Sequence, residues 1–453
     1  MPAQRKHAIV IGGGMAGLLA ARVLLNHYEG VTLIERDRYP AIPTFRPGTP
    51  QGRHVHVLLL GGQQAIEKLF PGFTAKLCAH GAVERDIIND TIFCYGARSP
   101  RRPSHLRGYT CTRQLIEWQV LQELRKFPRL TLLEGHEVRE LLYEDGVVRG
   151  VRLHQRNHQP PAQKQLEERG ADLVVDASGR YSRTPQWLDK LGYSPPRETA
   201  INAYLGYVTR FYAPPPNFQE TWKLVAIQAV GSQQRGGAIL CVEGDKEHPE
   251  RWMVVLVGMG KDYPPTDEAS FLEFARSLAD PSLYEAIKQA KPLSPIYAYR
   301  QHENYLRHFE QLRHFPTGLL VLGDAVCTFN PIYGQGMTVA ALEALLLDRF
   351  LSTTRGTPAE KLPLLFQKKL ARLIDFPWQM ASAADYRVIK GASARGLQRL
   401  THLYFERLIP LIAVDHSISV TFQEVLNMVR PPTALFHPAI MARVLTYRHE
   451  NGA

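Results

Sequence analysis

The opening of the chain constrains the fold more than any other part of it. An apolar run over residues 7–11 leads into Gly12, Gly14 and Gly17, which have the spacing G-x-G-x-x-G, and a helical pattern begins at once. A second apolar run follows and ends at Glu35. In such a unit Gly12 permits the tight turn, Gly14 lets a pyrophosphate approach the backbone, and Gly17 lets the helix pack closely on the strand. The pattern therefore predicts a βαβ unit that binds a dinucleotide at a helix N-terminus.

The acid at the end of the second run narrows the choice of dinucleotide. Glu35 lies 18 residues beyond Gly17, about where an acid accepts the hydroxyls of the adenosine ribose. An acid at this position favours a free ribose diol over a 2′-phosphate, so FAD or NAD fits better than NADP. Met15 and Ala16, which open the helix, and Arg36, which follows the acid, are expected to contact the same ligand.

A second motif selects FAD. About 310 residues after the first motif, another apolar strand ends in Gly-Asp at 323–324, and a loop leads into a long helix over 338–351. This loop can place Asp324 on a polyol chain and present the N–H groups of Gly336 and Met337 to the anionic edge of a reduced flavin. The cofactor-binding residues expected from the motif are Asp324, Pro331, Gly334, Gly336 and Met337.

With these two motifs the chain resembles the FAD-dependent aromatic hydroxylases and squalene-epoxidase-like monooxygenases, from residue 7 to about residue 350. Residues 113–121 resemble the family's R-x-x-L-x-x-x-L helix, which implies that Arg113 reaches the flavin pyrophosphate or ribityl region. Asp176 begins an Asp-Ala-Ser-Gly segment where the family has an Asp-Gly motif. That variant is shared with reductases and halogenases of the same fold. Residues 35–40 and 50–58 look most like bacterial epoxidases that act on polyketide or terpenoid olefins.

The segment Arg53-His54-Val55-His56 allows more than one interpretation. An H-x-H on a strand projects both rings to one face, as a metal site needs, but no third ligand is visible and no metal is expected. The resemblance instead places the segment beside the flavin ring, where Arg53 holds the flavin and His54 or His56 lines the pocket. Simple packing is the alternative. Val138 is also expected among the residues that contact the cofactor.

The order of the patterns predicts an α/β fold with a Rossmann-type FAD-binding domain, an antiparallel β-sheet substrate domain and a C-terminal helical region. The strands between 190 and 300 are expected to roof the flavin, with a helix over 269–279 between them, and the polar tract 155–169 reads as a hairpin tip or insertion. We assign residues 1–75, 105–189 and 301–355 to the FAD-binding domain, 76–104 and 190–300 to the substrate sheet, and 356–453 to the C-terminal helices.

The sheet of the substrate domain is expected to line an apolar pocket against the flavin face. Prolines are expected to break the helices of the C-terminal region at Pro410, Pro431–Pro432 and Pro438. The side chains that the strands offer to the pocket are Tyr204, Tyr207, Phe211, Ile227, Leu240, Val255 and Leu256.

Composition excludes several other classes of protein. No apolar stretch among the 453 residues reaches the roughly 18 that a membrane span needs, and the first strand begins too early for a signal peptide, so a cytoplasmic protein is expected. The five cysteines have no zinc or disulfide spacing. The net charge of +11 is spread along the chain and does not predict nucleic-acid binding. Its densest patch, at 98–107, is a solvated loop or a site for an anionic substrate, a pyridine nucleotide phosphate or an acidic reductase.

The resemblance implies an FAD-dependent monooxygenase that inserts one oxygen atom from O2 into an apolar polyene, terpenoid or aromatic metabolite through a flavin C4a-hydroperoxide. The FAD is expected to be non-covalent. There is no second dinucleotide unit, so NAD(P)H binds transiently or a separate flavin reductase supplies the electrons. Three alternatives share the fold. They are a reductase of isoprenoid double bonds, a halogenase, which the absence of a G-W-x-W-x-I-P segment disfavours, and a non-enzymatic binder of prenylated proteins, which the presence of Glu35, Arg113 and Asp324 disfavours.

Overall fold

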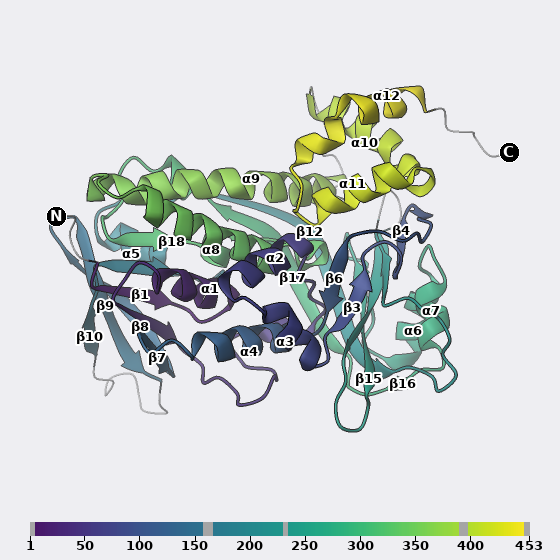
Figure 1. Ribbon diagram of the computed structural model, residues 1–453, viewed down its shortest axis with the longest axis horizontal. Helices are drawn as coiled ribbons and strands as arrows, with labels where there is room; N and C mark the ends of the chain where they lie inside the picture. The colour runs from purple at the N-terminus through teal and green to yellow at the C-terminus, as the bar shows by residue number, and fades with distance from the viewer. Residues whose placement is uncertain (1–4, 157–165, 230–233, 389–396, 448–453) are drawn as a thin grey trace.

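The computed structural model describes residues 5–156, 166–229, 234–388 and 397–447. A parallel sheet forms the core of one half of the molecule, on the left in Figure 1. Its strand order is β18-β11-β1-β2-β7. Strands β1, β2, β11 and β18 are almost entirely buried, as expected when helices cover a parallel sheet, whereas the edge strand β7 is only partly buried. The strands are β1 (His7–Ile11), β2 (Gly30–Glu35), β7 (Leu130–Glu134), β11 (Leu173–Asp176) and β18 (Leu319–Val321).

Helix α1 packs on this sheet, and α8 and α4 both pack on α1. Because β1, β11 and β18 are parallel neighbours, their carboxyl ends meet at one edge of the sheet, and the two motifs predicted to bind the cofactor follow β1 and β18. The helices of this half of the molecule are α1 (Met15–Leu24), α2 (Leu60–Leu69), α3 (Phe73–Ala79), α4 (Arg113–Leu124), α5 (Thr184–Lys190) and α8 (Gly336–Thr353).

Two small antiparallel sheets are also present, one beside the parallel sheet and one beside β14 (Arg235–Glu243) of the larger sheet described below. The first has the order β10-β9-β8 and the second pairs β3 with β6. The polar tract predicted as a hairpin tip falls largely on 157–165, which lie outside the described residues, and β9 and β10 pair on either side of it. The strands are β3 (Val83–Asp86), β6 (Arg107–Thr110), β8 (His136–Glu144), β9 (Val147–Gln155) and β10 (Glu167–Gly170).

A larger, mostly antiparallel sheet makes up the other half of the molecule, in the order β19-β17-β12-β15-β14-β13-β4-β5, with β16 paired to β12. β17 crosses residue 300, so the sheet extends beyond the boundary expected from sequence. Helices α6 (Glu268–Arg276) and α7 (Ser282–Ile287) accompany it. The strands are β4 (Thr91–Tyr95), β5 (Ala97–Arg98), β12 (Glu198–Ala213), β13 (Leu224–Ile227), β14 (Arg235–Glu243), β15 (Glu250–Gly258), β16 (Lys291–Pro292), β17 (Tyr297–Arg307) and β19 (Cys327–Thr328).

The two faces of this sheet have different neighbours, which corrects the predicted pocket lining. Ile227 and Leu256 pack with α6 and α7 on the face away from the cofactor unit. Tyr204 is 47% exposed at a bulge in β12, where its φ is 48°. Side chains alternate between the faces of a strand, so the choice of face reverses with each residue. The predicted residues that do face the cofactor unit are Tyr207, Phe211, Leu240 and Val255.

The described residues after 361 form mainly helices, and α10, α11 and α12 have a hydrophobic core of their own. Pro410 lies inside α10 rather than at its end, so the predicted break there is wrong. The burial of Leu408, Leu411 and Ile412 in that core holds the helix together across the proline. Pro438 is the first residue of α12, a position that tolerates proline. The helices are α9 (Leu362–Val388), α10 (Leu397–Val414), α11 (His416–Leu426) and α12 (Pro438–Thr446).

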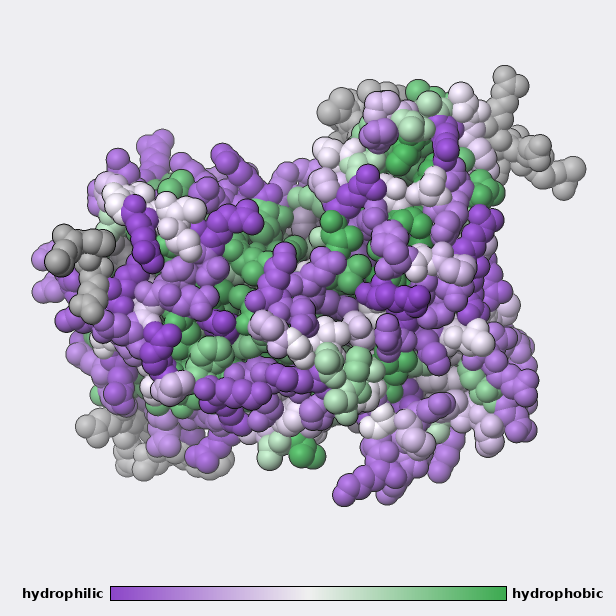
Figure 2. Space-filling model, viewed as in Figure 1, coloured by the Kyte–Doolittle hydropathy of each residue, from purple (hydrophilic) through white to green (hydrophobic). Residues whose placement is uncertain are grey.

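Helices α10, α11 and α12 sit on the rest of the molecule, at the upper right of Figure 1. The carbonyl of Asn427, after α11, accepts a hydrogen bond of 2.8 Å from the backbone N–H of Gly61 in α2. Figure 2 shows hydrophobic surface on these helices, where Val414 and Leu445 are among the exposed apolar side chains. No helix in the described ranges is both long and apolar enough to cross a membrane.

Candidate flavin site

The turn between β1 and α1 has the shape that the glycine spacing predicts. Gly12 has a φ of 94°, and a Cβ there would lie 2.6 Å from the carbonyl oxygen of Ala177. A Cβ on Gly17 would lie 1.8 Å from the carbonyl oxygen of Gly12, so only glycine lets α1 approach the strand. A Cβ on Gly14 would meet nothing within 4 Å. Gly14 therefore faces open space at the N-terminus of α1, where a pyrophosphate can approach the backbone.

Glu35 lies beside this turn, as predicted, and is buried. Its Oε2 accepts a hydrogen bond of 2.7 Å from the backbone N–H of Gly13, and its Oε1 accepts one of 2.9 Å from that of Asp37. The carboxylate is thus fixed by backbone donors at the edge of the open space. Arg36, between them, is exposed.

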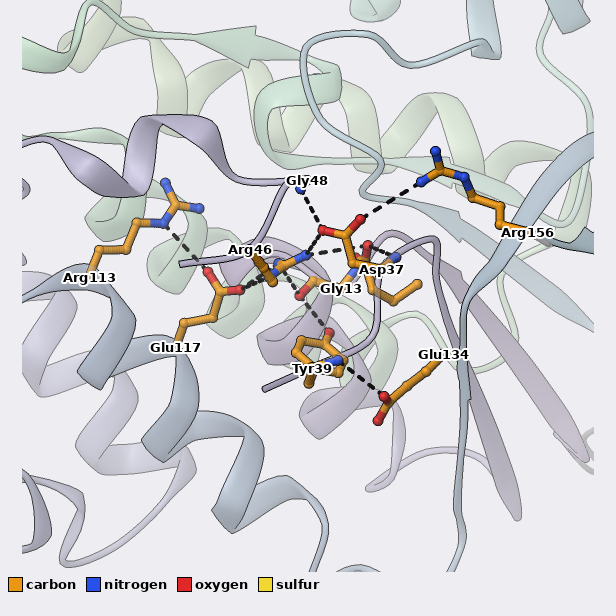
Figure 3. Close-up of polar contacts among 10 residues, drawn as sticks. Gly13, Asp37, Tyr39, Arg46, Gly48, Arg113, Glu117, Glu134 and Arg156 are labelled. Carbon is orange, nitrogen blue, oxygen red and sulfur yellow. Dashed lines mark hydrogen bonds and ion pairs between the residues drawn. The ribbon is translucent and has the colours of Figure 1, made fainter. Parts of the chain in front are cut away.

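A buried arginine that the sequence analysis missed joins this turn to α4 (Figure 3). Arg46 Nη1 lies 3.3 Å from a carboxylate oxygen of Glu35 and 3.3 Å from one of Asp37, and Arg46 Nε donates to Glu117 at 2.7 Å. Burial alone would lower the pKa of Arg46, but Glu117 and Glu35 raise it, and the net shift is upward. The guanidinium is therefore charged. No motif marks Arg46, because Glu117, to which it bonds most closely, is 71 residues away in the sequence.

Arg113 is the first residue of α4, and the hydroxyl of Thr112 accepts a hydrogen bond from the N–H of Leu115 to cap that helix. Arg113 Nε lies 3.5 Å from Glu117 Oε2, and its Nη1 lies 3.4 Å from His56 Nε2. The structure thus brings together two of the predicted site residues, Arg113 and His56.

The other two residues of the Arg-His-Val-His segment lie elsewhere. His54 is buried against the large sheet, with Nδ1 2.9 Å from Thr209 Oγ1 and its ring edge-on to Tyr207. Arg53 is exposed, and its guanidinium stacks over the rings of Phe45 and Tyr297. A direct contact of Arg53 with flavin stays a prediction. No cluster of three His, Cys, Asp or Glu side chains in the described ranges is arranged to hold a metal ion.

The second motif meets the first. Gly323 follows β18 with a φ of 67°, and a Cβ there would lie 2.6 Å from the Cβ of Ala16 in α1. The neighbouring carboxylate of Asp324 makes no hydrogen bond to the described part of the chain. Burial raises the pKa of Asp324, and the nearby charges of Arg113 and Arg180 oppose that rise. An acceptor held there without a partner fits the hydroxyls of a ligand.

The loop after Asp324 ends at the N-terminus of α8. Pro331 begins a short 3-10 turn, and Gly334 closes it with a φ of 63°. A Cβ on Gly336 would meet nothing within 4 Å, so the start of α8 faces open space as the start of α1 does. Met337 is buried behind it. The buried Gln335 Oε1 has no hydrogen-bond partner among the described residues, so it is a second acceptor to which a ligand can donate a hydrogen bond.

Two residues that were predicted to contact the cofactor, Asp176 and Val138, interact with other parts of the chain in the structure. The carboxylate of Asp176 accepts hydrogen bonds from the hydroxyls of Ser182 and Thr184 and from the N–H of Ser178, so it holds the loop after β11. Val138 packs in the main hydrophobic core. Contacts of Asp176 and Val138 with the cofactor stay predictions.

A comparison with protein families shows which family the chain belongs to. The model of the FAD binding domain family matches residues 5–365. The chain belongs to that family. FAD is its cofactor. The two open helix N-termini, the fixed Glu35 carboxylate and the Asp324 carboxylate, which has no hydrogen-bond partner among the described residues, fit it. All five cysteines are free.

This flavoprotein is also similar to individual proteins of known sequence or structure. It is 31% identical over 396 residues to Protein Rv3254 of Mycobacterium tuberculosis, covering 84% of the chain and 80% of that protein. It is 23% identical to kynurenine 3-monooxygenase of Drosophila willistoni, covering 92% and 88%. A solved triple mutant of the flavin-dependent brominase Bmp2 superposes with a TM-score of 0.66 at 14% identity, covering 96% and 98%. The flavoprotein is an FAD-dependent monooxygenase of the aromatic-hydroxylase type.

Proposed function

We propose that this monooxygenase inserts one oxygen atom from O2 into an apolar polyene, terpenoid or aromatic metabolite, by epoxidation or hydroxylation. The observation that carries the proposal is the apolar face of the large sheet toward the cofactor unit. Tyr207, Val255 and Met259 lie on one part of it, and Phe211 and Leu240 on another. An apolar substrate surface suits an olefin or an aromatic ring.

The segment after Arg53 covers the same face. Val55 packs against both apolar clusters, Val57 packs against the second, and Ile332, from the loop before α8, packs against the first. These three side chains are only partly buried. We propose that the substrate lies on the sheet beside these three side chains, next to the loop that leads into α8.

The chain's own residues then have three tasks. Glu35 and Asp324 hold the hydroxyls of FAD, and the N-termini of α1 and α8 bind its anionic groups. The apolar face positions the substrate and excludes water from the reacting atoms. When bound and reduced, FAD supplies the activation of dioxygen, so no protein nucleophile is needed. We propose that NAD(P)H or a separate flavin reductase delivers the electrons.

Isotopically labelled dioxygen tests the reaction. The holoenzyme is reduced without oxygen and then mixed with labelled O2 and a panel of apolar olefins and arenes. We expect a product that carries one labelled oxygen atom, and no label when only the water is labelled. A product that forms equally well without O2 and gains two hydrogens would replace the proposal with a reductase of isoprenoid double bonds. Failure of every apolar compound, with turnover of a polar one, would overturn the substrate class.

A further inference from the structure

Three fully buried polar side chains from distant segments meet behind the flavin loop, our name for the segment 325–335 that leads into α8. Asn304 lies on β17, Asn330 comes directly before Pro331, and Asp385 lies near the end of α9; each is 0% exposed. Asn304 Nδ2 donates to Asp385 Oδ2 at 2.7 Å, and Asn330 Nδ2 lies 3.4 Å from both oxygens of that carboxylate. The sequence analysis assigned no role to any of the three.

The polarity of these bonds fixes how both amides point. An ionised carboxylate only accepts hydrogen bonds, so both asparagines must turn their Nδ2 groups toward Asp385. Their carbonyl oxygens then point away from it. Asn304 Oδ1 accepts from the backbone N–H of Asn330 at 2.7 Å, and Asn330 Oδ1 accepts from that of Ile332 at 3.5 Å. By orienting the two amides, the carboxylate of Asp385 therefore determines two hydrogen bonds that the asparagine carbonyl oxygens accept from the backbone.

Those two backbone bonds hold the start of the loop that leads to α8. Asn330 caps the 3-10 turn Pro331–Tyr333, and Gly334 follows in the left-handed region before α8 begins at Gly336. Proline has a fixed φ, so the direction of the loop depends on the residue in front of it. A rotation of the Asn330 amide would release the turn and move the N–H groups that face the flavin.

We infer that Asp385 is a positioning residue for the flavin loop, acting through the orientation of the Asn304 and Asn330 amides. This role belongs to the C-terminal helical region, because α9 carries Asp385 to the loop. Burying a carboxylate is costly unless it is paired, and a polar cluster of this kind specifies one arrangement of its neighbours. The role goes beyond the proposed reaction and holds for any chemistry that FAD performs here.

A pair of substitutions separates amide orientation from simple packing. In Asp385→Asn the new side chain has nearly the same shape, but an NH2 donor replaces one of the two acceptor oxygens, so the amides of Asn304 and Asn330 compete for the single oxygen that remains. In the double variant Asp385→Asn with Asn330→Asp the carboxylate moves to position 330. There it accepts from the amide at 385 and still accepts from the N–H of Ile332, while Asn304 keeps both of its bonds. Asp375→Asn, at an exposed site on the same helix, is the control.

The measurements are the affinity for FAD, by titration of the flavin-free protein, and the visible absorbance and fluorescence of the bound flavin. We expect Asp385→Asn to weaken FAD binding about tenfold or more, the effect of losing a hydrogen bond to a charged group, and to change the flavin spectrum. The double variant should regain most of the affinity and the original spectrum, and Asp375→Asn should match the natural protein. If the single variant does not fold, the double variant must still fold and bind FAD. Unchanged binding and spectrum in Asp385→Asn, or a double variant worse than the single one, would overturn the inference.

Discussion

Glu343 on α8 accepts a hydrogen bond of 2.7 Å from the backbone N–H of Gly323, the residue that turns the chain after β18. Its carboxyl group is only 1% exposed and lies beside Asp324. Burial raises the pKa of Glu343 to about 8; the Gly323 N–H opposes this rise and the charge of Asp324 adds to it. The carboxyl behind the flavin motif is thus mostly protonated in the folded protein at neutral pH.

The first prediction is a pH dependence of stability that Glu343 causes. In the unfolded chain the pKa of this carboxyl is near 4.5, so between that value and about 8 the folded state holds a proton that the unfolded state has lost. The free energy of unfolding should therefore fall as pH rises through this window. Glu343→Gln keeps an acceptor for Gly323 and removes the titration. Urea unfolding of the flavin-free protein should show the variant gaining stability over the natural protein as pH rises. A difference that stays constant with pH would contradict this.

The second prediction concerns Glu35 and Asp324, the two carboxylates that we propose hold FAD. Glu35→Ala and Asp324→Ala should each weaken FAD binding about tenfold or more, because a hydrogen bond to a charged group contributes roughly 1.5–3 kcal/mol. Glu35→Ala should also lower the free energy of unfolding, since the carboxylate bonds to Gly13 and pairs with buried Arg46. Asp324 makes no such bonds, so its variant should lose affinity with little loss of stability. Glu144→Ala, at an exposed ion pair, is the control. Natural affinity in both variants would show that the flavin site is misplaced.

The sequence predicted the parts of the flavin site that depend on local pattern. Both glycine motifs, Glu35 and the start of α4 at Arg113 lie where their spacing indicates, because turns, caps and helix starts are encoded by neighbouring residues. Arg46 and Asp385 were missed for the opposite reason. Arg46 bonds to Glu117, 71 residues away, and Asp385 to Asn304, 81 residues away, and no local signal marks such pairs.

The alternation of side chains along the strands predicted the large sheet, but it did not show which face of the sheet meets the cofactor unit. Leu256 and Val255 are equally apolar neighbours, and only the packing of α6 and α7 shows that Leu256 faces away from the cofactor unit. Pro410 was misjudged because local propensity predicts a break, whereas burial of the residues around it keeps α10 continuous.

The third prediction concerns the contact between α4 and the large sheet. Glu243, at the end of β14, accepts hydrogen bonds from the backbone N–H and the hydroxyl of Thr112, which caps the helix that Arg113 begins. Thr112→Val keeps the shape but removes both the cap and one bond to a buried carboxylate. The free energy of unfolding should fall by about 1–2 kcal/mol. FAD should also bind more weakly, because the first turn of α4, which carries Arg113, loses its cap. Thr446→Val, at an exposed helix end, is the comparison. Equal stability of the two variants would show that the cap contributes nothing.

The last prediction tests the substrate face of the sheet. Ala226 and Ala238 are paired across β13 and β14, half-buried, and packed against the cluster that contains Phe211 and Leu240. Ala238→Phe would fill the space next to this face, where we propose that the substrate lies. The KM for the olefin or arene that supports turnover should rise severalfold or turnover should stop, while FAD content and flavin spectrum stay unchanged, because the substitution leaves the flavin motifs alone. Cys241→Val, on the same strand but the opposite face, should leave the KM unchanged. If Ala238→Phe has the natural KM, the substrate does not lie on this face. Loss of FAD in the variant would instead show that the face contacts the cofactor.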